Sequence, residues 1–237
     1  MTGMAGPLSR AFWRPRVVRW LATRPDRGGI RFLLRFHDRL YYFTLGVIKA
    51  SEAGIHPRHR LTDAHQFFLD HVGPGDRILD VGSAYGHIAA ALAAKAKAVT
   101  GLERRPEAVA RARAEFPAGN LVFEAGDFFD FRSAERYDVI VAANVLEHIR
   151  DRQAFLRKCA TLADRLLVRV PAVDRDWLVP YRRELGLEWR LHPDHEIEYT
   201  HETLRAELEA AGYVVRHTST SYGAIHGVAE IQRKGQG

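Results

Sequence analysis

The chain has 237 residues, of which 46% are hydrophobic and 27% are charged. This length and composition predict one α/β domain with a substantial core and additional elements, so that no second full domain is needed. The single cysteine, Cys159, excludes an internal disulfide framework, and its place in a helical pattern favours a position in the core. The sequence has neither an apolar run of membrane-spanning length nor the apolar segment of a signal peptide, so we expect a cytoplasmic protein.

Positive charge is concentrated at the N-terminal end of the chain. Residues 1–60 contain twelve Lys and Arg against three acidic residues, a net charge of +9, whereas the remaining residues sum to −3. Apolar residues recur at helical spacing from Trp13 to Leu21 and from Ile30 to Ile48, with arginines between them, which predicts amphipathic helices. We therefore expect residues 1–60 to form a basic helical extension. Its apolar faces could cover the flank of the following domain, a dimer partner, an anionic membrane surface or nucleic acid.

The rest of the chain alternates apolar runs with helical patterns. The runs predict strands at residues 77–81, 98–102, 121–124, 139–142 and 166–170. Helical patterns at residues 86–97, 106–115 and 151–163 lie between them, and this alternation predicts a parallel sheet. A last helix at residues 202–211 precedes two apolar runs on either side of Tyr222-Gly223, which predict an antiparallel hairpin. The expected fold class is therefore α/β, with a mostly parallel sheet and an antiparallel last strand.

The first predicted strand ends in the most informative segment of the chain. Its last residues contain Asp80, and small residues follow at alternate positions, Gly82, Ala84 and Gly86, before a helix begins. Small residues let a ligand approach the backbone, and such a turn at a helix N-terminus is how open α/β sheets hold adenosine-containing cofactors. The second strand ends in Glu103, about 20 residues further on, where a carboxylate can accept hydrogen bonds from ribose hydroxyls. The two signals together predict a nucleoside site.

The order D-x-G-x-A-x-G differs from the dinucleotide fingerprint and resembles the first motif of the class I S-adenosylmethionine-dependent methyltransferases, with Ala84 where that family most often has glycine. The resemblance continues at Gly126-Asp127-Phe128 and at 144–149, which is similar to the family's small-molecule branch. It implies a Rossmann-like sheet over residues 75–235 and S-adenosylmethionine as cofactor. The cofactor-binding residues that it implies are Asp80, Gly82, Ala84, Gly86, Glu103, Asp127, Phe128 and Asn144, with Asp127 and Phe128 flanking the adenine.

A long connection, residues 172–199, separates the fifth strand from the next helix. Such a long connection at the carboxyl edge of a sheet usually carries function, so we expect a substrate lid within a methyltransferase domain of residues 61–237. Its mixture of aromatic, Arg and Asp side chains suits a polyhydroxylated or anionic acceptor. The sequence segments at residues 193–200 and 54–61 resemble those of bacterial methyltransferases of glycan and surface-polysaccharide pathways. This resemblance implies that the methyl acceptor is a sugar or glycan-lipid hydroxyl.

Two histidines are candidates for removing the proton of an acceptor hydroxyl, because histidine titrates in the useful range. His195 lies in the predicted lid and is favoured for this role. His148 follows the fourth strand and is expected to open the next helix, where it could instead order the turn together with Glu147.

A metal site is the alternative use of histidine in this chain. The His-Pro-x-His pairs, His56 with His59 and His192 with His195, have the spacing of ligands, but a third and a fourth ligand cannot be located in the sequence. Methyl transfer needs no metal, because the sulfonium is already a strong electrophile and alignment of donor and acceptor supplies most of the rate. We therefore expect no metal.

The predicted activity is O-methylation of a small polar or glycan-type acceptor. Nucleic acid is not expected as a partner, since Ala142-Ala143-Asn144-Val145 stands where base-amino methyltransferases have Asn/Asp-Pro-Pro-aromatic, and Cys159 is misplaced for an RNA cytosine C5 nucleophile. A membrane-lipid or RNA-directed methyltransferase and a non-catalytic binding scaffold remain alternatives. Contact with a membrane through the N-terminal helices is a further possibility, and the sequence leaves the oligomeric state open.

Overall fold

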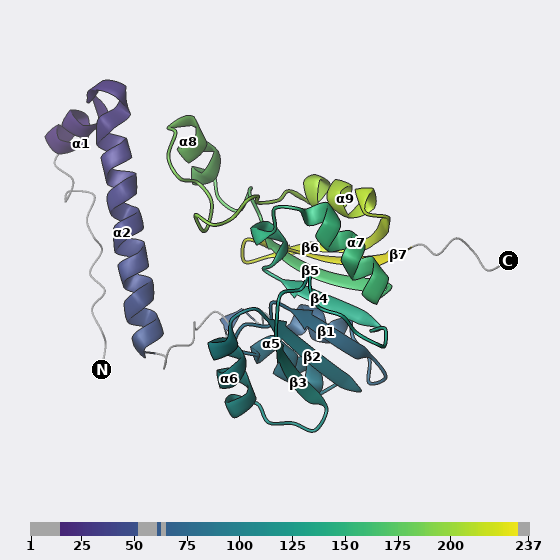
Figure 1. The fold of residues 1–237 in the computed structure, drawn as a ribbon. Coiled ribbons are helices and arrows are strands. Elements are labelled where there is room, and N and C mark those ends of the chain that lie inside the picture. The colour runs from purple at the N-terminus through teal and green to yellow at the C-terminus, as the bar shows by residue number, and fades with distance from the viewer. Residues whose placement is uncertain (1–14, 52–60, 63–64, 232–237) are drawn as a thin grey trace, which may run out of the picture. The chain divides into compact units, whose positions relative to one another are not determined.

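The computed structural model describes residues 15–51, 61–62 and 65–231 (Figure 1). The chain divides into two compact units, one made of Met1–Pro57 with Tyr181–Leu187 and the other of Arg58–Pro180 with Glu188–Gly237. Trp13 and the first histidine pair, His56 with His59, lie outside the described residues, as does most of the segment at residues 54–61.

The second unit contains a seven-stranded sheet in the order β3-β2-β1-β4-β5-β7-β6. Strands β1 to β5 pair in parallel, whereas β7 pairs antiparallel with both β5 and β6. This arrangement confirms the predicted fold class, including the hairpin around Tyr222-Gly223. The strands are β1 (Arg77–Val81), β2 (Ala98–Glu103), β3 (Leu121–Ala125), β4 (Val139–Ala143), β5 (Arg165–Pro171), β6 (Tyr213–Ser221) and β7 (Ala224–Ile231).

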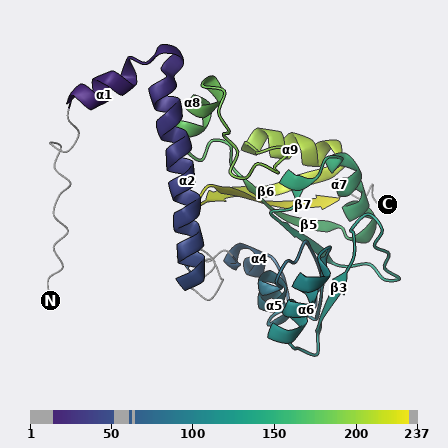
Figure 2. The same ribbon diagram turned by 60° about the vertical axis from the view of Figure 1, so that its left-hand side comes forward.

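Helices cover both faces of the sheet. One face carries α4, α5 and α6, and the other carries α7 and α9 (Figures 1 and 2). Side-chain caps define two of the helix starts: Asp151 accepts a hydrogen bond from the Ala154 N–H at 2.9 Å, and Thr200 forms a reciprocal capping box with Thr203. The helices of this unit are α4 (Gln66–Asp70), α5 (His87–Ala93), α6 (Pro106–Glu115), α7 (Arg152–Leu162) and α9 (His201–Ala210), while α8 (Leu178–Glu184) crosses the boundary between the units.

Two predicted helix boundaries were wrong. The helix expected to reach Lys97 ends at Ala93, because the Asn120 amide donates to the carbonyl groups of Ala93 and Ala96 at 2.8 and 3.1 Å and thereby caps the helix from outside. His148 does not open α7. It ends a separate 3₁₀ turn, Leu146–His148, and the helix begins only after the Asp151 cap.

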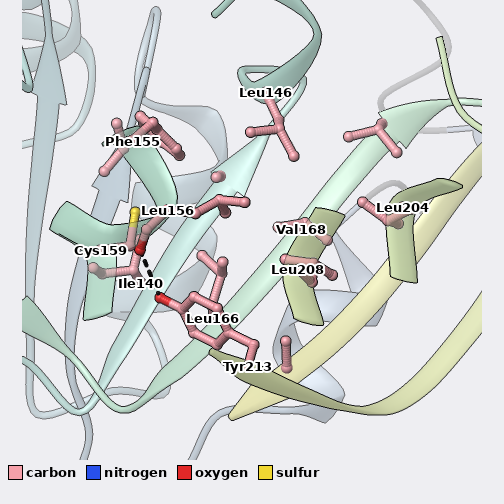
Figure 3. Packing of buried hydrophobic residues seen from close by; sticks show 14 of the residues in the cluster. Ile140, Leu146, Phe155, Leu156, Cys159, Leu166, Val168, Leu204, Leu208 and Tyr213 are labelled. Atoms are coloured by element: carbon pink, nitrogen blue, oxygen red, sulfur yellow. Dashed lines mark hydrogen bonds between the residues drawn. The ribbon is translucent and has the colours of Figure 1, made fainter. Parts of the chain in front are cut away.

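Buried apolar side chains fill the space between the sheet and each helical layer. Figure 3 shows part of the cluster beneath α7 and α9, where the Tyr213 hydroxyl donates to the Leu156 carbonyl at 3.3 Å. Cys159 lies in this cluster with no exposed surface, which confirms its predicted position. Burial raises the pKa of its thiol, so the residue is an inert core side chain and not a nucleophile.

The first unit contains the N-terminal helices α1 (Pro15–Ala22) and α2 (Gly28–Ser51). Gly29 allows α2 to pass close to α1, since a Cβ atom there would lie 2.1 Å from the Leu21 carbonyl oxygen. Within the same unit Arg182 donates two hydrogen bonds to Asp38, at 2.7 and 2.8 Å, and lowers the pKa of that carboxyl group. Among the described helices, none combines the length and the apolar character needed to cross a membrane.

Candidate active site

A cavity of about 620 Å³ opens at the carboxyl ends of β1, β2 and β4. Strand order reverses between β1 and β4, and ligands of open α/β sheets bind at such a crevice. All of the cavity's lining residues belong to the sheet-containing unit. Those singled out from the sequence are Gly82, Ala84, Glu103, Asp127, Phe128, Asn144 and His148, whereas Asp80, Gly86 and His195 do not line the cavity.

The turn after β1 is held in a left-handed conformation at three alternate positions. Gly82, Ala84 and Gly86 have φ angles of 72°, 49° and 86°. A side chain at Gly82 would collide with Val145, whose Cγ2 atom would lie 2.6 Å from the added Cβ, and a side chain at Gly86 would collide with Phe123. The turn therefore requires small residues for its own packing, and Ala84 is the position where a Cβ is accommodated.

Glu103 ties this turn to the end of β2. Its carboxylate accepts hydrogen bonds of 3.0 Å from the Ala84 N–H and from the backbone and side chain of Arg105. Burial would raise the pKa of Glu103, but the hydrogen bonds from Arg105 and Ala84 outweigh it, so the pKa lies below its usual value. The group is therefore ionised at neutral pH, as a carboxylate that binds hydroxyl groups should be. The Arg105 side chain, half exposed, can move aside for such a ligand.

Asp80 lies behind the turn, within the sheet. The residue is 1% exposed, and its Oδ2 atom has no hydrogen-bond partner in the described part of the chain. Burial, with the nearby charge of Glu103, raises the pKa of Asp80 to about 8, although a backbone hydrogen bond to Ala89 opposes the shift. Asp80 is thus held neutral over most of the physiological range unless a ligand or water supplies a partner.

The far end of the cavity is aromatic. Asp127 turns the chain after β3 by accepting from the Phe129 N–H at 2.8 Å. The Phe128 ring packs against Phe155 with centroids 4.8 Å apart, and the Lys158 ammonium lies 5.2 Å from the centroid of Phe128. An apolar ring beside a carboxylate suits a flat heterocycle with exocyclic donors.

Asn144 fixes the turn after β4. It has a φ of 58°, its side-chain amide donates to Glu147 Oε1 at 2.9 Å, and its side-chain carbonyl accepts from Arg169 on β5 at 2.8 Å. The Asn144 N–H also donates to the Arg169 carbonyl at 2.8 Å. These three hydrogen bonds place Glu147 and His148 at the edge of the cavity.

The two candidate histidines lie together although they are far apart in sequence. The rings of His148 and His195 have centroids 4.8 Å apart and planes at 79°. His195 is buried, with Nδ1 3.0 Å from Glu198 Oε1, and Nδ1 of His148 lies 3.3 Å from Asp194 Oδ2. Burial lowers the pKa of His148, against the opposing charge of Asp194. The lid is joined to the β4 turn at the same place, where the Glu196 N–H donates to the Glu147 carbonyl at 2.7 Å.

Several residues of the site were not singled out from the sequence. Arg105 and Asp194 line the cavity beside the predicted residues, and Arg169 and Glu198 hold Asn144 and His195 in place. Arg105 lies two residues after Glu103, so its position in the sequence is a local signal. Glu198 lies three residues after His195, whereas Arg169 and Asp194 act through contacts between distant segments, for which spacing gives no signal.

A family described as a methyltransferase domain matches residues 54–218. The chain belongs to the class I S-adenosylmethionine-dependent methyltransferases. The enzyme is therefore a methyltransferase, and S-adenosylmethionine is its cofactor. A ubiquinone biosynthesis O-methyltransferase from Methylobacterium sp. (strain 4-46) is 30% identical over an alignment of 243 positions. The alignment covers 92% of this chain and 88% of that relative.

Solved structures share the fold of this methyltransferase at lower identity. A methyltransferase in complex with the Trm112 activator from Haloferax volcanii is 18% identical, with a TM-score of 0.63 over 81% of this chain and 98% of the other. Magnesium protoporphyrin IX methyltransferase from Synechocystis PCC 6803 is 21% identical, with a TM-score of 0.57 over 72% and 80%. These likenesses show the fold.

The raised pKa of Asp80 predicts that the Asp80→Asn variant is more stable than the parent, by an amount that grows as the pH rises. Because the pKa of Asp80 is raised to about 8 in the folded protein, from an ordinary value of 3.8, its ionisation destabilises the fold increasingly as pH rises between these values. Each pKa unit corresponds to about 1.4 kcal/mol, so the variant should be more stable than the parent by at least about 2 kcal/mol at pH 8, and by less at pH 5.

Thermal unfolding of the ligand-free proteins at the two pH values measures this difference. Asp130→Asn, at an exposed position, is the control and should leave the unfolding temperature unchanged. A lower unfolding temperature for Asp80→Asn at pH 8 would show that the buried carboxylate has a partner and is not a source of strain.

Proposed function

We propose that this methyltransferase transfers the methyl group of S-adenosylmethionine to a hydroxyl oxygen of a neutral, small acceptor. The observation that carries the proposal is the histidine pair, His148 and His195, each held by a carboxylate, next to the cavity at the end of β4. Transfer to oxygen requires removal of a proton, and such a pair is suited to that step. The relative that covers most of the chain is named an O-methyltransferase, which supports the same reaction.

The proposed pose of the cofactor follows the cavity. The ribose hydroxyls bind Glu103, the adenine lies between Asp127 and Phe128, and the methionine part follows the backbone of the turn from Gly82 to Gly86. The sulfonium then faces Asn144 and His148 at the β4 end. The ionised state of Glu103 and the apolar surface of Phe128 support this order.

The reaction forms a bond between the acceptor oxygen and the methyl carbon while the carbon–sulfur bond breaks, and its electron pair stays on sulfur as S-adenosylhomocysteine leaves. The hydroxyl proton passes to an imidazole nitrogen. Glu198 holds the Nδ1 side of His195, which leaves Nε2 as the acceptor of the proton, and Asp194 does the same for His148. We propose His195 as the base, with His148, which lines the cavity, as the residue nearest to the acceptor.

The acceptor is proposed to be neutral and hydroxylated. Three of the lid arginines that suggested an anionic acceptor already have carboxylate partners: Arg175 pairs with Glu198, Arg190 with Glu188 and Arg182 with Asp38. A glycan-type hydroxyl therefore remains the proposal, and an acceptor of ubiquinone biosynthesis is the second candidate because of the relative's name. Methyl transfer from labelled S-adenosylmethionine to sugar and to quinone-precursor acceptors distinguishes the two. Turnover of neither class would contradict both.

The N-terminal helices are proposed to meet an anionic membrane surface. Phe32, Phe36 and Phe43 on α2 are 63%, 56% and 70% exposed, and arginines lie between them in sequence. A basic helix with exposed aromatic side chains binds at the interface of such membranes. This position would bring the enzyme close to an acceptor held at the membrane surface.

Glu103→Ala is expected to weaken the binding of S-adenosylmethionine about tenfold to a hundredfold, because charge-assisted hydrogen bonds worth about 1.5–3 kcal/mol are lost. Isothermal titration measures the change. Glu124→Ala, at an exposed position of β3, is the matched control and should bind like the parent. Parental affinity in a folded Glu103→Ala protein would refute the proposed pose.

His195→Ala and His148→Ala should slow methyl transfer by about 10²–10⁴-fold, the usual contribution of a positioned base, without loss of cofactor binding. Single-turnover rates at saturating acceptor, together with calorimetric affinity for S-adenosylmethionine, separate the two effects. His217→Ala, at an exposed position of β6, is the control. If His195→Ala keeps the full rate while His148→Ala does not, the base is His148, and if both keep it, alignment alone suffices.

Replacement of Phe32, Phe36 and Phe43 together by serine should abolish cosedimentation of the full chain with anionic vesicles, because it removes the apolar contact that burial in the interface requires. Binding by the parent should decline with salt, since the arginines contribute by electrostatic attraction. Equal sedimentation of parent and variant would show that these phenylalanines do not make the contact, and no sedimentation of the parent would contradict the proposed membrane contact.

A further inference from the structure

A second group of side chains beside the cavity has the chemistry of a metal site. Glu147, His148 and His195 each offer one ligand atom, and these atoms lie within 4.8 Å of one another. The spacing of histidines in the sequence pointed to His192 and His195 as a pair. The structure instead brings His195 to the acid and the histidine that follow β4.

The Glu147 carboxylate has no exposed surface, and only one of its oxygens is satisfied. Oε1 accepts the hydrogen bond from Asn144, whereas Oε2 is buried without a hydrogen-bond partner in the described part of the chain. Burying a carboxylate oxygen without a hydrogen-bond partner destabilises the folded protein, so a bound partner such as a metal ion is expected at this oxygen. Two imidazoles lie beside it.

Both histidines are oriented as metal ligands are. Such histidines almost always have a carboxylate or carbonyl on the ring nitrogen that does not bind the metal. Here Glu198 Oε1 lies 3.0 Å from Nδ1 of His195, and Asp194 Oδ2 lies 3.3 Å from Nδ1 of His148. Nε2 of His195 is therefore left for a further partner. Glu198 is itself held by an ion pair with Arg175 and by the Leu191 N–H, which makes the support of His195 rigid.

We propose that Glu147, His148 and His195 bind one divalent transition-metal ion such as Zn²⁺. Two imidazoles and one carboxylate are a ligand set of catalytic zinc sites, with a fourth position open to water or substrate, and imidazole favours such ions over Mg²⁺. Tetrahedral ligands at about 2.0–2.1 Å from zinc lie roughly 3.3 Å apart, so the separations between the three atoms would shrink by at most about 1.5 Å when the ion binds. His148 is partly exposed and can supply much of that movement.

The role of the ion rests on the proposed function, but its binding does not. An acceptor hydroxyl in the open position would lose its proton to solvent water more readily, and the metal would hold the resulting alkoxide for attack on the methyl carbon. The two histidines would then be ligands and not the base. The cavity reaches this position, since His148 and Asp194 line it.

The test uses the full-length protein, freed of metal with a chelator and dialysed. Zn²⁺ titrated by calorimetry should bind with a stoichiometry of one, and Co²⁺ should give the visible absorption of a site with nitrogen and oxygen ligands. Glu147→Gln, which keeps the shape of the side chain, should weaken Zn²⁺ binding at least tenfold. Glu198→Gln should weaken it by about 10–100-fold through the loss of support for His195.

Two controls keep the outcomes distinct. Glu124→Gln and His217→Ala, at exposed positions, should bind Zn²⁺ like the parent. Calorimetric affinity for S-adenosylmethionine is measured in every variant, so a loss of folding or of the cofactor site is seen separately. Absence of stoichiometric Zn²⁺ or Co²⁺ binding by the parent, or parental binding by Glu147→Gln, would overturn the metal site.

Measurements of methyl transfer with and without added metal distinguish a role of the ion from a role of the histidines as base. If the metal-free protein binds S-adenosylmethionine but transfers no methyl group until Zn²⁺ or Co²⁺ is added, the ion has the proposed role. Full methyl transfer by the metal-free protein would overturn that role and leave the proposed methyltransferase function intact. Failure of the parent to bind S-adenosylmethionine would instead contradict the proposed function, whatever the metal result.

Discussion

The hydrogen bonds of Asn144 are the interaction on which the rest of the site depends. They join β4 to Arg169 of β5 and hold Glu147 in the turn that follows. Asn144 has a left-handed backbone conformation, with a φ of 58°, and asparagine adopts that conformation more readily than most residues. The cavity, the histidine pair and the attachment of the lid at Glu196 all follow from where this turn lies.

The site is built from carboxylates in unequal environments. Glu103 is ionised because hydrogen bonds from Arg105 and Ala84 outweigh its burial, whereas burial dominates at Asp80 and Glu147 and raises the pKa of both. Glu198, which is also buried, is held below its usual pKa by His195, Leu191 and Arg175. Carboxylates without full partners are expected at positions where a bound ligand completes the structure.

Much of the fold could be predicted from the sequence, because each strand is a short apolar run and each run is followed by a turn or a helix start. The turn residues Gly82 and Ala84 and the acids Glu103 and Asp127 were found for the same reason, since local spacing places them at strand ends. The end of α5 was missed because its cap comes from Asn120, which belongs to another segment. The approach of His195 to Glu147 depends on how the lid folds back, and no local pattern encodes it.

We propose that the cavity at the ends of β1, β2 and β4 orients the cofactor with its sulfur toward the β4 turn. A crystal structure of the full-length chain with bound S-adenosylhomocysteine would test this pose. We expect the ribose hydroxyls on Glu103, the adenine beside Phe128 and the sulfur nearest to Asn144 and His148. A nucleoside bound elsewhere, or one bound with its adenine toward His148, would show that the pose is wrong.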